Sequence, residues 1–226
     1  MKGFDDLIGG GIPPGNIILV QGAAGTGKSM FATQFIYSGA LEENETGVYV
    51  TLEEFPDKFI ANAKKVGFTE IDRLISERKM AVVKNEVFDM DKLISSIEEV
   101  IDEYKAKRLV LDSISALSAF AEKPWLVRKT IFDIANMLKR ENVTAIFTGG
   151  VSAASEGHFG SAIEEYVVDG VVILFHPVVG IKFTRAIGVV KMRGTAHSES
   201  LHPVVITDLG VNVLHSSMFN ENFKIN

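Results

Sequence analysis

Cysteine is absent from the 226 residues of the sequence. Its absence excludes disulfides and thiolate metal sites, and it fits a reducing compartment, with the cytoplasm as the default expectation. Long apolar runs are lacking as well: the longest apolar region, 166–181, is interrupted by Asp169, His176 and Pro177. A membrane span needs about 20 consecutive apolar residues, so this region is predicted to be a buried strand followed by a turn. Neither a signal peptide nor a membrane segment is expected.

Basic residues are fewer than acidic residues in this sequence. The 23 lysines and arginines against 29 aspartates and glutamates give a formal net charge of −6, so no global attraction to nucleic acid or to an anionic membrane is expected. Hydrophobic residues make up 46% of the chain, which is enough for a substantial core. The simplest prediction is one α/β domain over residues 1–226, with a polar tail at 216–226 that is flexible or docked on a neighbouring subunit.

Strands and helices alternate over the first two thirds of the chain. Short apolar runs rich in β-branched residues predict strands at 16–21, 48–52, 108–111 and 143–148. Apolar residues at helical spacing predict helices around 32–40, 93–104 and 127–138. This order predicts a mostly parallel sheet flanked by helices on both faces. Further strands, expected to extend the sheet in largely antiparallel fashion, are predicted at 171–175, 185–191, 204–206 and 211–214.

A glycine-rich loop separates the first predicted strand from the first predicted helix. It matches the phosphate-loop pattern GxxxxGK(S/T) through Gly22, Ala23, Ala24, Gly25, Thr26, Gly27, Lys28 and Ser29. In this pattern successive backbone amides and the helix N-terminus point at phosphate oxygens. Lys28 is then expected to reach the β and γ phosphates of ATP, and the Ser29 hydroxyl to ligate Mg²⁺. The alternative is a glycine turn with a helix-capping serine, which the flanking strand and helix disfavour.

Carboxylates stand at the ends of two predicted strands, where ligands of open parallel sheets bind. Asp112 ends the apolar run Leu109–Leu111 and is favoured as a Mg²⁺ ligand, the alternative being a cap on the following helical turn. Glu53 and Glu54 end the 48–52 strand, and Glu53 is the candidate for orienting the attacking water. Spacing alone supports equally a solvated acidic helix start, where glutamates favour the helix dipole.

Three further segments, taken in chain order, carry a family resemblance. The first is Gly3-Phe4-Asp5-Asp6-Leu7 with Gly9-Gly10-Gly11-Ile12-Pro13 and Gly15, ahead of the phosphate loop. The second is Tyr49-Val50-Thr51-Leu52-Glu53-Glu54-Phe55-Pro56, followed by Asn62-Ala63 and Gly67-Phe68. The third is Lys191-Met192-Arg193-Gly194-Thr195-Ala196-His197, with Ile206-Thr207-Asp208-Leu209-Gly210-Val211. Together they span nearly the whole chain, which resembles a single-domain KaiC-like ATPase of the RecA superfamily, as found in archaea and bacteria.

The resemblance implies a RecA-like fold that assembles as a homo-hexameric ring with ATP or ADP and Mg²⁺ at the subunit interfaces. It implies that Glu53 activates water, with Glu54 next to the nucleotide, and Glu53 is also a candidate Mg²⁺ ligand together with Ser29 and Asp112. It also implies that Lys191 and Arg193 reach across the interface toward the γ-phosphate, where a cation supplied in trans stabilises the developing charge. Thr195, His197 and Asp208 are implied to line the nucleotide from the same side. Without the resemblance, Lys191 and Arg193 are simply alternate residues on one face of an exposed strand.

The chain also departs from KaiC. KaiC proper carries two such domains, and the serine and threonine that are phosphorylated in its second domain correspond here, around 163–169, to Glu165 and Tyr166. The resemblance therefore does not extend to the autokinase cycle or to a clock role. The expectation is a slow ATPase of regulatory or signalling duty, with a protein partner that the sequence does not name.

Two other functions compete with this one. A RadA-like recombination ATPase would bind DNA, but the loop 149–160 contains no lysine or arginine, and only 21 residues precede Gly22, too few for an additional DNA-binding domain. DNA binding is therefore possible but not favoured. A scaffold in which ATP holds a ring together without being hydrolysed fits the same residues. GTP also stays open, because the loop reads phosphates rather than the base. The five histidines lack paired spacing, and no structural zinc is expected.

Overall fold

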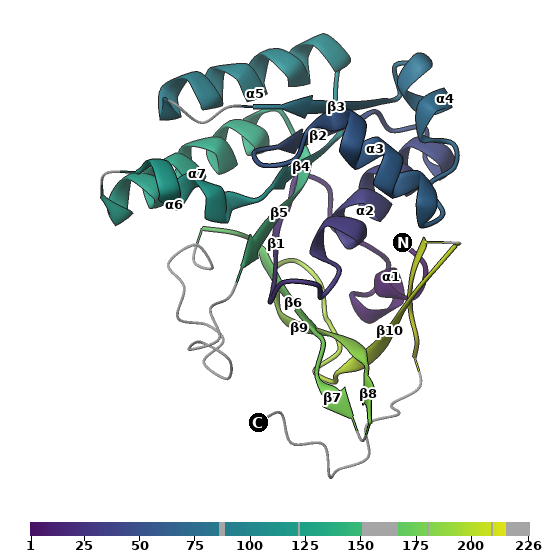
Figure 1. The fold of residues 1–226 in the computed structure, drawn as a ribbon. Helices are drawn as coiled ribbons and strands as arrows, with labels where there is room; N and C mark the ends of the chain where they lie inside the picture. The colour runs from purple at the N-terminus through teal and green to yellow at the C-terminus, as the bar shows by residue number, and fades with distance from the viewer. Residues whose placement is uncertain (86–88, 122, 151–166, 180, 209, 216–226) are drawn as a thin grey trace.

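The computed structural model describes residues 1–85, 89–121, 123–150, 167–179, 181–208 and 210–215. Within this part of the chain, a nine-stranded sheet runs in the order β11-β10-β9-β6-β1-β5-β4-β2-β3 (Figure 1). Its strands are β1 (Ile17–Gly22), β2 (Gly47–Thr51), β3 (Met80–Lys84), β4 (Arg108–Asp112), β5 (Thr144–Gly150), β6 (Gly170–Phe175), β9 (Arg185–Met192), β10 (His202–Thr207) and β11 (Gly210–Val213). A separate hairpin joins β7 (Val178–Val179) to β8 (Lys182–Phe183).

The sheet has a parallel part and an antiparallel part, as predicted, except that β6, which was expected to belong to the antiparallel extension, pairs in parallel with β1. Strands β3, β2, β4, β5, β1 and β6 pair in parallel. Strands β9, β10 and β11 then extend the sheet from β6 in antiparallel pairs. β3 was not predicted: it lies at the edge of the sheet, and only its first two residues are buried, so its sequence carries a weak apolar signal.

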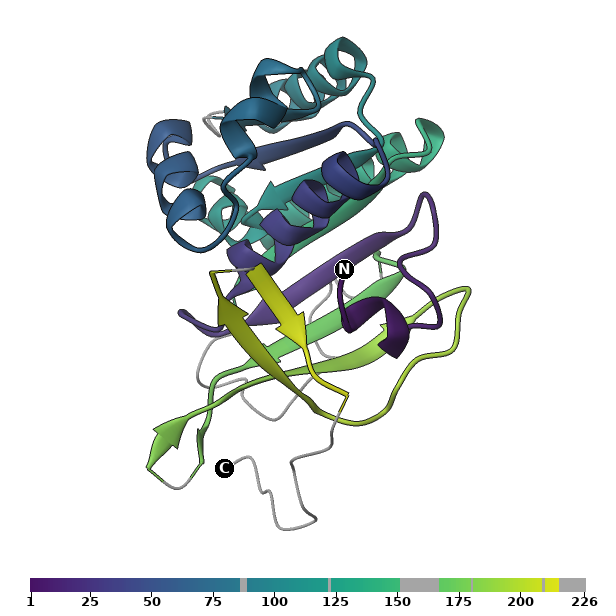
Figure 2. The ribbon, with the colours of Figure 1, turned by 90° about the vertical axis from the view of Figure 1, so that its right-hand side faces the viewer.

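Helices cover both faces of the sheet (Figures 1 and 2). They are α1 (Phe4–Leu7), α2 (Lys28–Glu42), α3 (Pro56–Lys65), α4 (Ile71–Ser76), α5 (Met90–Tyr104), α6 (Leu117–Phe120) and α7 (Pro124–Arg140), with a 3-10 turn at Ile114–Ala116. Because side chains alternate along a strand, Ile18 and Val20 of β1 join the core beneath α1 to α4, whereas Ile17 and Leu19 join the core beneath α5 and α7. No described helix is both long and apolar enough to cross a membrane.

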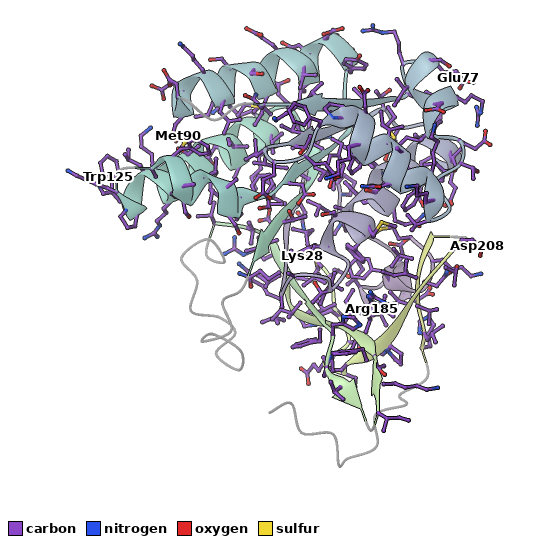
Figure 3. The ribbon with its side chains drawn as sticks, viewed as in Figure 1. Lys28, Glu77, Met90, Trp125, Arg185 and Asp208 are labelled. Atoms are coloured by element: carbon purple, nitrogen blue, oxygen red, sulfur yellow. The ribbon has the colours of Figure 1, made fainter. Side chains whose placement is uncertain are left out.

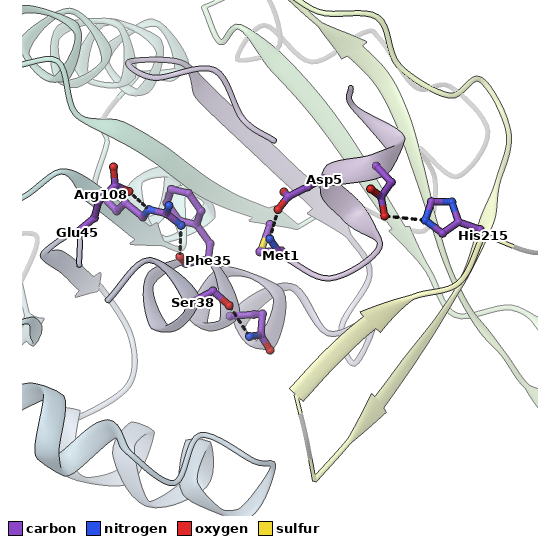
Figure 4. Close-up of polar contacts among 9 residues, drawn as sticks. Met1, Asp5, Phe35, Ser38, Glu45, Arg108 and His215 are labelled. Carbon is purple, nitrogen blue, oxygen red and sulfur yellow. Dashed lines mark hydrogen bonds and ion pairs between the residues drawn. The ribbon is translucent and has the colours of Figure 1, made fainter. Parts of the chain in front are cut away.

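Arg108 fixes α2 against the start of β4 (Figure 4). Its Nη1 donates to the Phe35 carbonyl at 2.9 Å, and its Nε donates to Glu45 Oε2 at 2.6 Å. The guanidinium also lies 4.8 Å from the centre of the Phe35 ring. A Cβ at Gly39 would fall 2.4 Å from Arg108 Nε, so the glycine leaves room for this contact. These contacts hold the helix that begins with the phosphate loop.

Several expectations lie outside the described residues. They concern the tail 216–226, most of the loop 149–160, and the positions of Glu165 and Tyr166. The single-domain assignment stays a prediction.

Candidate functional site

The phosphate loop turns from the end of β1 into the start of α2. Gly25 and Gly27 have φ values of 80° and 104°, in the left-handed region that favours glycine. A Cβ at Gly22 would lie 2.5 Å from the Leu174 carbonyl oxygen, so this position also requires glycine. The residue that caps α2 is Gly27, so the cap has no side chain to hydrogen-bond the first amides of the helix. The loop is thus shaped as a concave anion site at a helix N-terminus.

Lys28 lies over this loop. Its Nζ donates to the Gly22 carbonyl at 2.8 Å and to the Ala23 carbonyl at 3.0 Å. Burial lowers the pKa of the Lys28 ammonium, and the carboxylates of Asp112 and Glu53 oppose that shift. Lys28, the predicted cation, therefore lies close enough to Asp112 and Glu53, the two predicted acids, to interact with them electrostatically.

Asp112 stands at the carboxyl end of β4 between two hydroxyl donors. Tyr49 donates to its Oδ2 at 2.5 Å, and Thr148 donates to its Oδ1. Burial raises the pKa of Tyr49 well above its usual value, and the negative charge of Asp112 raises it further, so the phenol stays protonated as the donor. The nearby hydroxyls of Ser29 and Thr33 oppose this shift and lower the pKa of Tyr49. Tyr49 thereby holds Asp112, one of the two predicted Mg²⁺ ligands, and lies near the other, Ser29.

The two adjacent glutamates diverge after β2. The Thr51 hydroxyl accepts from the amide of Glu53 at 3.3 Å and from the amide of Glu54 at 2.9 Å, which turns the chain at this point. Glu53 is exposed, and its Oε2 accepts from the Ser113 hydroxyl at 3.4 Å, beside Asp112. Glu54 instead accepts from Asn62 of α3 at 3.1 Å. Glu53 faces the metal ligands, whereas Glu54 braces α3.

A pocket of about 540 Å³ opens next to the loop. Its lining comes from the phosphate loop, from Val66 after α3, and from Arg185 and Ile206 on β9 and β10. Arg185 was not predicted, because a single arginine at the start of a strand forms no motif. Its Nη2 donates to the Gly25 carbonyl at 3.4 Å, so it reaches the loop itself. The volume lies within the usual range of small-ligand pockets, about 300–1,000 Å³.

Asp208 lies at this same end of the sheet, in the turn between β10 and β11 (Figure 3). A Cβ at Gly67, just after α3, would fall 2.3 Å from the Asp208 carbonyl oxygen, and Ile206 lies against Gly27. The structure thus separates Asp208 from Lys191 and Arg193, with which the resemblance grouped it.

The remaining predicted residues lie at the opposite end of the sheet. Met192 pairs with Gly170, which pairs with Ile18 near the start of β1. Lys191 donates to the Val168 carbonyl at 2.6 Å, and Arg193 lies 3.6 Å from Asp169. A strand rises about 3.3 Å per residue, so this end is roughly 15 Å from Gly22 along β1. Lys191 and Arg193 do not reach the phosphate loop of their own chain.

Thr195 and His197 follow at the same end of the sheet as Arg193. The Thr195 hydroxyl donates to the Ile8 carbonyl at 2.8 Å, which ties this segment to the N-terminal turn. His197 Nδ1 lies 3.1 Å from the Ser198 carbonyl oxygen. Both residues therefore lie on the side of Arg193, away from the phosphate loop of their own chain.

The glycine loop lies between β1 and α2 with Lys28 over it, and Asp112 ends β4, which is separated from β1 by β5 alone. This arrangement defines a P-loop nucleotide-binding protein with a RecA-like fold. The family described as KaiC ATPase matches residues 1–218. The chain belongs to this family.

Relatives of two lengths resemble the chain. The circadian clock oscillator protein KaiC of Parathermosynechococcus lividus is 36% identical over 223 residues, covering 94% of this chain but 41% of that protein. The chain thus spans about two fifths of the length of such KaiC relatives. A UPF0273 protein of Methanocaldococcus jannaschii is 35% identical over 230 residues, covering 94% of this chain and 93% of that protein. The crystal structure of a KaiC-like protein from Pyrococcus horikoshii matches with a TM-score of 0.86 at 34% identity, covering 95% of this chain and 96% of that one.

The residues present fit a nucleotide and a magnesium ion. The left-handed glycines and the start of α2 form a cradle for phosphates, and Lys28 supplies the neutralising cation. Ser29 and Asp112 offer the hard oxygen donors that Mg²⁺ prefers. The chain is therefore a nucleotide-binding protein of the KaiC family.

Proposed function

We propose that this chain binds ATP with Mg²⁺ and hydrolyses it slowly at the interface between copies of itself in a closed ring, most simply a hexamer. One observation carries the proposal. Lys28, Asp112 and Glu53 share one end of the sheet, while Lys191 and Arg193 lie at the other end. A site that needs both sets of residues requires two copies of the chain, and head-to-tail contacts between such copies can close a ring.

Each residue has a defined task in this proposal. The loop amides and Lys28 hold the phosphates, and Ser29 and Asp112 hold Mg²⁺, which neutralises charge on the β and γ phosphates when bound. Glu53 orients the attacking water and accepts its proton. Arg193 of the adjacent copy, with Lys191, stabilises the charge that develops on the γ-phosphate.

The pocket beside the loop extends this assignment to the rest of the nucleotide. Arg185 and Ile206 border the space next to the phosphates, and the Asp208 backbone lies against Gly67, which follows the lining residue Val66. We assign the base and ribose to this pocket in the same copy that holds the phosphates. Thr195 and His197 then approach the nucleotide from the adjacent copy, because they lie beside Arg193.

Phosphate release by Glu53→Gln tests the catalytic part of the proposal. The substitution keeps the shape of the side chain and removes its basicity, so hydrolysis should fall by about 100-fold or more. ATP affinity, measured by calorimetry, should stay within a few-fold of wild type. The matched control is Asp57→Asn, which removes one exposed carboxylate from the first turn of α3 and should leave both quantities unchanged.

Two results would contradict the catalytic assignment. Wild-type turnover by Glu53→Gln would show that another group activates the water. An unchanged, negligible phosphate release by wild type and variant alike, despite tight ATP binding, would instead favour an ATP-dependent scaffold that does not hydrolyse its nucleotide. A regulatory role through a protein partner remains part of the proposal, and binding of the ATP-loaded ring by a partner protein would support it.

A further inference from the structure

Helix α7 presents an aromatic and basic stripe to solvent. Its apolar face packs on the sheet through residues that include Ile131 and Ile134, which are fully buried. The opposite face carries Trp125 and Phe132, whose exposed fractions are 58% and 50%. Figure 3 shows Trp125 at the margin of the molecule, far from Lys28. Large aromatic side chains exposed to this extent are typical of contact surfaces.

The stripe borders a hollow of about 440 Å³ that also includes Arg193. We define the α7 patch by residues that line this hollow and share its open side: Trp125, Arg128, Phe132, Lys139 and Arg193. The helical members are spaced at three, four and seven residues, which places them on one face of α7. The patch therefore joins two elements distant in sequence, α7 and the end of β9.

Asp169 connects these two elements. Its carboxylate is almost buried; Oδ1 lies 2.9 Å from Lys139 Nζ and 3.6 Å from Arg193 Nη1, and Oδ2 accepts from the Ile17 amide at 3.1 Å. The Arg193 amide donates to the Asp169 carbonyl at 2.9 Å. Arg193 is thus held at a fixed place next to α7 and at the start of β1.

We propose that a second copy of this chain covers the α7 patch, and that it is the copy whose nucleotide receives Arg193. This inference rests on the proposed function, because it uses Arg193 as the cation given to the neighbour. Arg193 is itself part of the patch, so a copy that places its triphosphate on Arg193 lies against α7 as well.

Charge complementarity points to the same occupant. The α7 patch carries Arg128, Lys139 and Arg193, whereas the phosphate-loop end of the next copy carries Glu53 and Asp112 together with the triphosphate. Opposite potentials steer the two ends together and disfavour contacts between like ends. Arg193 and the phosphate loop lie at different ends of the sheet, so each copy offers one of each, as a closed head-to-tail ring requires.

The fluorescence of Trp125 tests this inference directly, because it is the single tryptophan of the chain. Its emission and its quenching by acrylamide are followed over a dilution series with and without ATP and Mg²⁺, while light scattering gives the mass. We expect assembly to shift the emission to shorter wavelength and to reduce quenching several-fold in step with the mass. An increase in mass that leaves Trp125 as accessible as in the monomer would overturn the inference and leave the ring intact. A chain that stays monomeric with saturating ATP would overturn the ring itself.

Substitution at the patch gives a second measurement that keeps the tryptophan. Phe132→Asp should weaken assembly at least tenfold in dissociation constant, while calorimetric ATP binding to the monomer and the melting temperature stay close to wild type, since Phe132 is half exposed. The matched control is Leu41→Asp on α2, an exposed apolar residue outside the patch, which should assemble normally. Assembly of Phe132→Asp with the wild-type dissociation constant would refute the proposed contact.

Nucleic acid is the competing occupant, because aromatic and basic side chains also bind single strands. A single-stranded oligonucleotide added to dilute, unassembled protein is expected to leave Trp125 quenching unchanged. Protection of Trp125 by the oligonucleotide, weakening steeply with salt and without assembly of the protein, would assign the patch to nucleic acid instead.

Discussion

The Tyr49 hydroxyl offers a quantitative test of how the candidate metal site is held. Tyr49 is fully buried, and its hydroxyl donates to Asp112 Oδ2 at 2.5 Å, near the hydroxyls of Ser29 and Thr33. The Tyr49→Phe substitution keeps the ring, which lies 4.2 Å from the Phe59 ring between centroids, and removes only this donor. The perturbation therefore acts on the orientation of Asp112 rather than on core packing.

The substitution is expected to change two quantities, the melting temperature and the Mg²⁺ dependence of nucleotide binding. Loss of a hydrogen bond to a charged group costs about 1.5–3 kcal/mol, and in a domain of this size each kcal/mol lowers the melting temperature by about 2–4 °C. Scanning calorimetry of the nucleotide-free protein should thus show a decrease of roughly 3–12 °C. In addition, partners that orient metal ligands typically contribute 10–100-fold in affinity. The Mg²⁺ concentration that supports half-maximal binding of a fluorescent ATP analogue should therefore rise by about tenfold or more.

Tyr37→Phe is the matched control. Tyr37 is also buried, and its hydroxyl accepts from the Glu70 amide at 3.2 Å, away from the candidate site. Its loss should lower stability without changing the Mg²⁺ dependence. Equal Mg²⁺ dependence in Tyr49→Phe, Tyr37→Phe and wild type would refute the argument that Tyr49 positions the metal ligands.

Three further predictions concern packing, the Asp169 junction and pH. Gly47→Ala should destabilise the chain by about 1–3 kcal/mol, because the added Cβ would lie 2.4 Å from Ile36 Cγ2 in a packed core; an unchanged urea midpoint would contradict this. Asp169→Asn should lower phosphate release more than ATP affinity, because it loosens Arg193; equal losses in both would point to general misfolding. Burial lowers the pKa of His202 below 6.5, so the folded state favours neutral imidazole. Stability should therefore be complete above pH 6.5 and decline as the pH falls, and His202→Gln should flatten that decline in acid-unfolding curves; an equally steep decline in the variant would exclude His202 as its source.

The parts of the molecule that sequence predicts well are those with strong local patterns. The phosphate loop has a fixed spacing between a strand and a helix, and Asp112 ends a run of buried residues, so local patterns alone locate both. The antiparallel extension is predictable because its strands follow each other without helical periodicity. The family assignment follows from three segments in order, and the match to residues 1–218 confirms it.

The parts that could not be predicted depend on contacts between distant segments. Tyr49 sits in an otherwise apolar strand, and only the pairing of β2 with β4 brings its hydroxyl to Asp112. Arg185 reaches the phosphate loop because β9 pairs next to β6. The chain reverses direction between β9 and β10. Arg193, after β9, and Asp208, after β10, therefore lie at opposite ends of the sheet. Strand order, which sequence does not encode locally, decides all three.

Mixing two inactive variants tests the central claim most directly. Lys28→Ala removes the phosphate-binding cation of one copy, and Arg193→Ala removes the cation offered to the next, so neither should hydrolyse ATP alone. In co-assembled rings some interfaces pair an intact phosphate loop with an intact Arg193, and phosphate release should recover to a fraction set by the mixing ratio. Mixed rings that are verified by mass and still release no phosphate would contradict a site shared between two copies.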